Sequence, residues 1–249
     1  MAVPTPGHAA TTAARIWIPS IIYRIARFLP RNEVACSLRV VDKAIAAMLQ
    51  TPEFTTVRLS EPVPHHAFTW RWGRPGAMRD LTRAQRHELV WLTVASGATA
   101  NLALAARVAG CGLTDEVGYA AGKAGQPGSC ALLAELGCDM GRAVEGAAAG
   151  GHLALCEELL ASEAGDLCSF LSCAFAAAKA GHIHVVEWMG CDLAALHRYA
   201  VQFVGPKGEE EGHEAWFEEV EVRVVAAAAG SPTTDWRANL EWLKSRIFS

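Results

Sequence analysis

The chain has 249 residues, of which 51% are hydrophobic and 19% charged, and its net charge is −4 at pH 7. This composition is typical of a folded globular protein and excludes an intrinsically disordered chain. No segment approaches the ~18 consecutive apolar residues of a membrane-spanning helix, so we expect no membrane insertion. The charge is uneven, because residues 1–87 carry 12 Lys/Arg and 5 Asp/Glu whereas residues 88–249 carry 10 and 21. Such asymmetry indicates two functional regions.

Two features bear on the compartment in which the chain works. Residues 1–14 (MAVPTPGHAATTAA) lack the basic start and long apolar run of a secretory signal, and we expect a disordered tail there. An organelle-targeting peptide is the alternative, since this segment contains no acid. The eight cysteines include no Cys-x-x-Cys pair, and most lie in Ala/Leu-rich segments. They predict a reducing compartment, the cytoplasm or the nucleus, with neither disulfides nor a zinc site.

The apolar pattern of residues 16–49 (IWIPSIIYRIARFLPRNEVACSLRVVDKAIAAML) predicts two helices. In the first, hydrophobic residues recur at helical spacing after Pro19, and Pro30 ends the helix. Asn32 has a side chain that is common at helix caps, so we expect it to begin the second helix. The apolar positions of the second helix are Val34, Cys36, Leu38, Val41, Ile45 and Leu49.

The order Ile-Pro, a helix ending in Phe-Leu-Pro, and a second helix with Leu-Arg-x-Val and a basic residue resembles the F-box motif. The resemblance implies that residues 15–50 bind a Skp-type adaptor and thereby a cullin–RING ubiquitin ligase. The residues that fill the matching positions are Ile18, Pro19, Ile22, Ile25, Leu29, Leu38 and Val41. The Trp usual in the last helix is missing, and Ala44–Ala47 lie there instead. The alternative is that these helices only cover the first apolar face of a repeat stack.

Residues 51–84 contain four prolines and two glycines, which argues against long helices and indicates a connector. The stretch TTVRL (55–59) has the composition of one short strand. Trp70 and Trp72 lie among arginines, and aromatic rings beside phosphate-neutralising arginines are typical of RNA-binding segments. The interpretation we favour is that the tryptophans pack on the first repeat and the arginines face the acidic half.

Five segments of the remaining chain share one pattern: a small-residue helix, a glycine, and a second helix with Leu, Val or Trp at core spacing. The anchoring glycines are Gly97, Gly125, Gly151, Gly181 and Gly230. They are 28, 26, 30 and 49 residues apart, and an acidic insertion at residues 205–223 explains the last spacing. Each helix pair can bury its apolar face only by stacking on its neighbours. We expect each anchoring glycine to adopt the left-handed conformation that ends the first helix.

The segments Ala147–Gly165 and Ala177–Cys191 resemble the middle of the ankyrin repeat, with Gly151-His152 and Gly181-His182 in its Gly-His position. The resemblance covers residues 85–249 and implies a solenoid of helix pairs that binds a protein client. It departs from the family because no unit has the Thr-Pro-Leu-His opening and the units are shorter than ~33 residues. We therefore expect trimmed fingers between units. An F-box-like start before Ala-rich units is similar to a large group of green-algal ankyrin-repeat proteins.

His152 and Cys156 are four residues apart on a predicted helix, a spacing that would suit a metal or catalytic pair. However, the position of Cys156 is taken by Cys130 and Val186 in neighbouring units, and that of His152 also varies. A ligand pair would not be interchangeable in this way within one chain. We therefore predict a structural pair, with Cys156 in a slot for a small buried hydrophobe.

Together these patterns predict an all-α protein, an ankyrin-like helical repeat solenoid preceded by a small N-terminal helical F-box-like segment. We expect protein–protein recognition without catalysis, and we assign no catalytic, cofactor-binding or metal-binding residue. The leading hypothesis is a substrate receptor whose repeats hold a protein client while the N-terminal segment recruits the ligase adaptor. The alternative is an RNA-associated or ribonucleoprotein scaffold that uses the basic, aromatic connector. Candidate client contacts near the predicted turns between units are Asp115, Glu116, Tyr119, Arg142 and Phe170.

Overall fold

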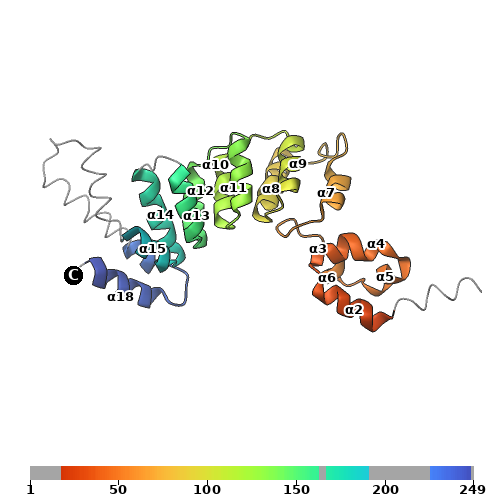
Figure 1. Cartoon of the computed structure of the whole chain (residues 1–249), viewed down its shortest axis with the longest axis horizontal. Coiled ribbons are helices and arrows are strands. Elements are labelled where there is room, and N and C mark those ends of the chain that lie inside the picture. Colours follow the sequence, from red (N-terminus) through yellow and green to blue (C-terminus); the bar gives the residue numbers. More distant parts are fainter. Residues whose placement is uncertain (1–17, 163–166, 191–224, 248–249) are drawn as a thin grey trace, which may run out of the picture. The chain divides into compact units, whose positions relative to one another are not determined.

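The structure, a computed structural model, describes residues 18–162, 167–190 and 225–247, and every regular element in these ranges is a helix (Figure 1). The prediction of an all-α protein is confirmed for this part of the chain. None of these helices combines the length and apolar character that a bilayer crossing needs. The chain divides into two compact units, residues 1–110 and 111–249, so the first predicted helix pair groups with the N-terminal helices. The expected tail and the acidic insertion lie outside the described residues.

The first unit opens with a helix whose two ends are set by prolines. α2 (Pro19–Phe28) has a proline in its first turn, where the missing N–H costs nothing, and it stops before Pro30. The next stretch begins as α3 (Arg31–Glu33), continues as the π-helix η1 (Val34–Leu38) and ends as α4 (Arg39–Val41). The first predicted helix is therefore confirmed. The second begins at Arg31, directly after the proline that separates the two helices.

Asp42 interrupts the second predicted helix, which the sequence pattern had continued to Leu49. Its backbone is extended, with φ −151° and ψ 146°, and its carboxylate accepts a hydrogen bond of 2.6 Å from the backbone N of Ala44. This contact caps a new helix, α5 (Lys43–Met48). α6 (Pro52–Thr55) follows as a single short turn. The prediction of one continuous helix was wrong because the helix-capping side chain of Asp42 lies in its middle.

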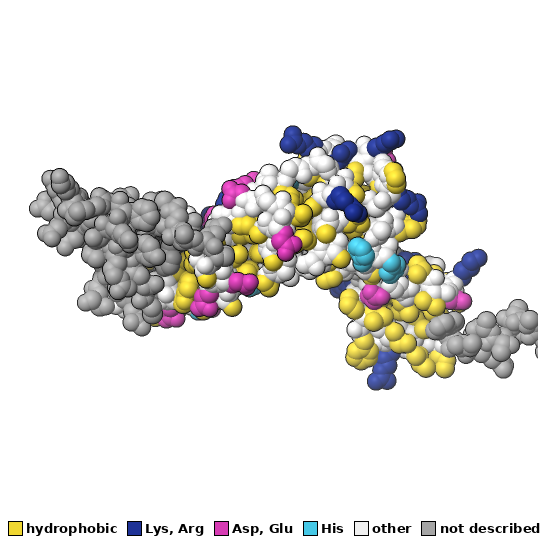
Figure 2. All heavy atoms as spheres, turned by 45° about the horizontal axis from the view of Figure 1, so that its top comes forward, with side chains coloured by type: hydrophobic (Ala, Val, Ile, Leu, Met, Phe, Trp, Pro, Cys, Tyr) yellow, Lys and Arg dark blue, Asp and Glu magenta, His cyan; other side chains and the backbone are white. Residues whose placement is uncertain are grey.

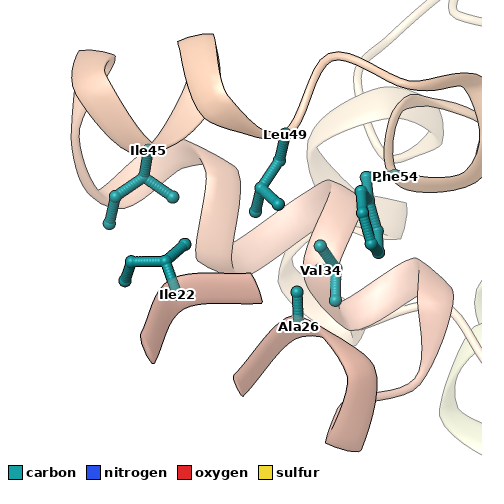
Figure 3. Packing of buried hydrophobic residues seen from close by; sticks show 6 residues of the cluster. All are labelled: Ile22, Ala26, Val34, Ile45, Leu49 and Phe54. Carbon is teal, nitrogen blue, oxygen red and sulfur yellow. The ribbon is translucent and has the colours of Figure 1, made fainter. Parts of the chain in front are cut away.

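Side chains from α2, η1, α5 and α6, with one residue that follows α5, form a single hydrophobic core (Figure 3). Its buried members are Ile22, Ala26, Val34, Ile45, Leu49 and Phe54. Leu29, Leu38 and Met48 pack against this core from its margin. Burial of each large side chain contributes about 1.5–3 kcal/mol, which stabilises this small group of short helices. α2 uses only part of its circumference for the core, so its remaining apolar side chains face outward.

Asn32 is fully buried and holds the segment that follows α6. Its Nδ2 donates to the carbonyl oxygens of Arg58 (2.7 Å), Glu61 (3.1 Å) and Pro62 (3.1 Å), and its Oδ1 accepts from the backbone N of Arg58 (2.9 Å). The prediction that Asn32 caps the second helix was wrong, because its side-chain amide forms hydrogen bonds with this later segment instead. The predicted strand at 55–59 is also not found, since the structure describes this stretch as a helix end, an unpaired extended piece and a turn.

Three further helices complete the first unit: α7 (His65–Trp72), α8 (Arg83–Ala95) and α9 (Thr99–Ala109). Thr82 begins α8 with a capping box, in which its hydroxyl accepts from the backbone N of Gln85 and the Gln85 side chain accepts from the backbone N of Thr82. α9 packs on both α7 and α8. The connector therefore contains a helix of its own, which its prolines and glycines had not predicted.

The second unit consists of paired helices (Figure 1). The first helices of the pairs are α10 (Asp115–Lys123), α12 (Gly141–Gly150) and α14 (Leu167–Ala180). Their partners are α11 (Pro127–Glu135), α13 (Leu153–Ser162) and α15 (Ile183–Gly190). A helical turn at 225–229 and α18 (Trp236–Ile247) follow. α10 packs on α12 and α12 packs on α14, so the first helices form a continuous row.

Two glycines bring the backbones of α10 and α12 into direct contact. A Cβ at Gly122 would collide with the carbonyl oxygen of Ala143, and a Cβ at Gly146 would collide with that of Tyr119. Glycine inside a helix costs about 1 kcal/mol relative to alanine, so these positions need a compensating reason. The close helix contact is that reason.

The anchoring glycines adopt the predicted conformation at four of five places. Gly97, Gly125, Gly151 and Gly181 have φ values of 72°, 63°, 75° and 81°, in the left-handed region that ends a helix. Gly230 is the exception, because it follows its helical turn without a positive φ. The prediction is thereby confirmed for the four units that contain a full first helix.

Candidate functional site

α2 exposes a row of large apolar side chains beside the face that it buries. Ile18 at its N-cap and Ile21, Ile25 and Phe28 within it are all exposed, and Phe28 has 80% of its surface in contact with solvent. Their spacing of three, four and three residues places them on one side of the helix. We call these four residues the α2 stripe. Contiguous exposed apolar rows are found at contact surfaces more often than elsewhere on a protein.

The seven residues predicted to bind an adaptor fall into two groups. The exposed group is Ile18, Pro19, Ile25 and Val41. The remaining three serve the core: Ile22 is 1% exposed, and Leu29 and Leu38 pack against the buried cluster. Sequence reasoning missed the exposed Ile21, Phe28 and Val40. The helical spacing of the α2 stripe could have indicated the first two, but not which apolar side of α2 would be buried.

A polar and aromatic cluster lies on α10 and α12 in the second unit. The guanidinium carbon of Arg142 is 5.1 Å from the ring centroid of Tyr119, its Nε donates to Oε2 of Glu145 at 3.2 Å, and its Nη1 lies 3.9 Å from Oδ2 of Asp115. The hydrogen bond with Glu145 is the main cause that raises the pKa of Arg142. Lys123 approaches the same ring, with Nζ 5.9 Å from the centroid. We call these residues the Tyr119 cluster.

Three of the five predicted client contacts therefore meet in one cluster. They are Asp115, Tyr119 and Arg142. Glu116 is exposed on α10 but forms no contact with the cluster among the described interactions. Phe170 lies in α14, and its side chain is outside the described residues. Glu145, which joins the cluster, was missed by sequence reasoning, although its position three residues after Arg142 places both on one side of α12.

A hollow of about 450 Å³ begins at Glu145 and extends along α14. Its lining residues are Glu145, Ser172, Phe175, Ala176, Lys179, Ala226 and Ala227. The lining combines one aromatic ring, small side chains and one charge of each sign. Because Glu145 belongs to both features, the hollow and the Tyr119 cluster form one continuous surface on the first helices. This surface can accept an apolar side chain beside paired charges.

The cysteine slot of the repeat is buried, as predicted. Cys130, Cys156 and Val186 occupy equivalent positions in three units and are all buried. Burial raises the pKa of the Cys130 and Cys156 thiols to about 11, and it raises the pKa of Cys173 still further. At neutral pH these groups are thiols, whereas metal binding and nucleophilic attack need the thiolate. The slot is therefore a packing position.

The histidines of the Gly-His pairs lie over the glycines of the preceding units. His152 places its ring against Gly125, and its Nε2 lies 3.1 Å from the carbonyl oxygen of Lys123, which can only accept a hydrogen bond. His182 places its ring against Gly151 in the same manner. Burial, and then the neighbouring His184, lower the pKa of His182. Both rings link successive helix pairs, which agrees with the structural role predicted for His152.

One of the two tryptophans of the connector is not packed as the favoured interpretation expected. Trp70 is 64% exposed, whereas Trp72 is partly buried. Arg74 lies over the ring of Trp70, with its guanidinium carbon 4.5 Å from the centroid, and Arg71 lies over Trp72 at 4.1 Å. For Trp70 the expectation of packing was wrong, because α7 turns this ring away from the buried Phe68 on the same helix.

Within the described residues, no group of three or more His, Cys, Asp or Glu side chains is arranged to hold a metal ion. Comparisons of this chain with protein-family models, with curated proteins and with solved structures found no match.

Proposed function

We propose that this chain is a non-catalytic protein-recognition module whose second unit forms an ankyrin-like solenoid that holds a protein client. Three consecutive helix pairs support the solenoid, because each first helix ends at a left-handed glycine and the first helices form a row. The client surface is the Tyr119 cluster with the adjoining hollow. Aromatic and arginine side chains next to an apolar hollow are the groups that contribute most at protein interfaces. A location in the cytoplasm or the nucleus belongs to the same proposal.

The N-terminal helices act, in this proposal, as an F-box-like segment that recruits a Skp-type adaptor and through it a cullin. The single observation that carries this part is the α2 stripe, because four large apolar side chains face outward beside a core that is complete without them. Val40 and Val41 add two exposed apolar side chains on α4. An apolar helix face that enters a partner's groove is a common recognition mode. The chain would then be a substrate receptor of a cullin–RING ubiquitin ligase.

The test uses the full chain and a purified Skp-type adaptor bound to a cullin fragment. The Ile25→Asp/Phe28→Asp variant places two charges in the α2 stripe without touching the core. Val57→Asp is the control for a charge placed on an exposed apolar side chain, since Val57 belongs to the same unit and lies outside the stripe. Ile22 is unsuitable for substitution here because a charge in the core would unfold the segment.

We expect the intact chain and the Val57→Asp control to bind the adaptor complex, and the double variant to lose binding with an unchanged circular dichroism spectrum. If the intact chain does not bind, or if the double variant binds as well as the control, the receptor proposal fails. The second unit would then recognise a client without a link to a ligase.

A further inference from the structure

The segment from Trp70 to Arg86 joins α7 to α8 and carries five arginines against a single acid, Asp80. Three backbone hydrogen bonds of 3.0–3.1 Å, each closing a four-residue turn, fold residues 74–81 into a compact loop. Met78 is the buried residue of this loop, and Gly76 has a φ of 79° that its tight turn requires. The arginines of this loop therefore project from a backbone that its own hydrogen bonds hold in a defined conformation. Lys and Arg side chains gather over this part of the first unit (Figure 2).

A hollow of about 370 Å³ lies within this segment and between it and α9. Arg74 and Arg79 line it from the loop, Arg86 lines it from α8, and Trp72 and Val108 contribute apolar surface. None of the described lining residues is acidic. Three arginines line this hollow, and it is positively charged because each arginine keeps its charge at any physiological pH.

The three arginines form no ion pair with the described residues of the first unit. No carboxylate there pairs with Arg74, Arg79 or Arg86, and Asp80 forms no ion pair with them. Arg86 donates from Nε to the carbonyl oxygen of Leu81 at 3.1 Å, which fixes its side chain and leaves its terminal nitrogens for another acceptor. Phosphate oxygens, like carboxylate oxygens, form strong and often bidentate hydrogen bonds with arginine.

The exposed ring of Trp70 stands next to this positive hollow. Arg74 connects the two, since it lines the hollow and also covers part of the Trp70 ring at 4.5 Å from the centroid. The stacked guanidinium holds the indole in place while most of the ring surface remains open to solvent. A phosphate site beside an open aromatic ring suits a nucleotide, whose base stacks while its phosphate binds arginine.

We propose that residues 70–86 bind single-stranded nucleic acid, with a phosphate in the hollow between Arg74, Arg79 and Arg86 and a base stacked on Trp70. This site goes beyond the recognition of a protein client and lies in a different segment from the α2 stripe and the Tyr119 cluster. Single strands suit it because their bases are free to stack, whereas the bases of a duplex are not.

The test is fluorescence anisotropy of the full chain with labelled 12-nucleotide uridine and thymidine oligomers at several salt concentrations. Trp70→Ala removes the stacking ring, and Arg74→Glu/Arg79→Glu reverses two charges at the hollow. Arg24→Glu/Arg27→Glu is the matched control, because it makes the same change in net charge with exposed arginines on α2. We expect Trp70→Ala to weaken binding at least about fivefold with an unchanged salt dependence.

We expect Arg74→Glu/Arg79→Glu to abolish binding and the α2 control to change affinity less than about twofold. Binding of either the RNA or the DNA oligomer in this pattern supports the site and shows which sugar it accepts. The proposal fails if neither oligomer binds at low salt, or if the α2 control loses as much affinity as the loop variant. It also fails if Trp70→Ala has no effect while polyphosphate or a phosphoserine peptide competes equally, because the hollow would then bind phosphate without a base.

Discussion

The imidazole of His152 lies over the α-carbon of Gly125, so close that a Cβ at Gly125 would be 2.6 Å from Cε1 of the ring. The same relationship occurs between His182 and Gly151, and Thr233 takes the place of the ring over Gly181. Each of these glycines therefore has two constraints, a left-handed backbone and the side chain of the next unit above it. The histidine of each Gly-His pair therefore packs on the anchoring glycine of the preceding unit and links the two units.

Gly125→Ala will destabilise the second unit more than Gly137→Ala. Both glycines have a positive φ, of 63° and 75°, so alanine costs about 1–2 kcal/mol at either place. Only Gly125 has a neighbour in the way, because a Cβ at Gly137 would meet nothing within 4 Å. We expect urea unfolding to show an additional loss of about 1–3 kcal/mol for Gly125→Ala. Equal losses would mean that the His152 ring moves aside freely.

His152→Ala should relieve part of the damage caused by Gly125→Ala. In the double variant the methyl group at position 125 occupies the space of the lost ring, so the two losses in the free energy of unfolding will be less than additive. The single His152→Ala variant loses the hydrogen bond to the carbonyl oxygen of Lys123 and serves as the reference. Strict additivity in urea unfolding would contradict a direct contact between the two residues.

The stability of the second unit will fall as the pH drops below about 6.5, the ordinary pKa of histidine. Burial, followed by His184, holds the pKa of His182 lower in the folded chain, and a hydrogen bond with the backbone of Ala149 opposes this only in part. The unfolded chain therefore binds a proton first as the pH falls, which favours unfolding. His182→Gln, which copies Gln126 of another unit, should reduce the difference in urea midpoint between pH 7.5 and 5.5. An unchanged difference would assign the effect to other groups.

Ile22 and Ile21 are adjacent residues of α2, but their truncation to alanine will change the stability of the first unit by very different amounts. Ile22 is in the core, and its truncation should cost about 2–4 kcal/mol of unfolding free energy. Ile21 is exposed in the α2 stripe, so Ile21→Ala should change stability by less than about 0.5 kcal/mol. Thermal unfolding of both variants measures the contrast. A similar loss for both would mean that the stripe is covered within the chain itself.

Asn32→Ala will loosen residues 58–62 and destabilise the first unit by about 2–4 kcal/mol, because several buried backbone groups lose their partner. Asn32→Asp tests the direction of the hydrogen bonds, since a carboxylate can accept from the backbone N of Arg58 but cannot donate to the carbonyl oxygens. We expect it to be destabilising as well. Thermal unfolding that leaves Asn32→Asp at the stability of the unchanged chain would show that donation by Nδ2 contributes little.

Elements defined by residues close in sequence could be predicted, and contacts across the chain could not. The start and end of α2 follow from Pro19 and Pro30, and the helix pairs of the second unit follow from Gly125 and Gly151. These residues act on their own backbone, so the sequence itself carries the signal. Asn32 escaped prediction because its partners are 26 to 30 residues away. Its capping preference was a weaker influence than four hydrogen bonds in the interior.

The candidate surfaces were predictable only in part for a similar reason. Asp115, Tyr119 and Arg142 were proposed from their positions near turns, and the structure brings all three together. Nothing in the sequence distinguished the buried Ile22 from the exposed Ile25, since both fit an apolar helix face three residues apart. The exposure of Trp70 was unpredictable for the same reason, because it depends on which side of α7 faces the core.

The reciprocal glycines Gly122 and Gly146 have a consequence for recognition by the second unit. The backbones of α10 and α12 touch at these two glycines, so no side chain separates the helices there. Tyr119 and Arg142 project from these two closely packed helices, and their contact is formed within the unit itself. A client that binds there meets a preorganised surface, and little of its binding energy is spent on ordering the receptor.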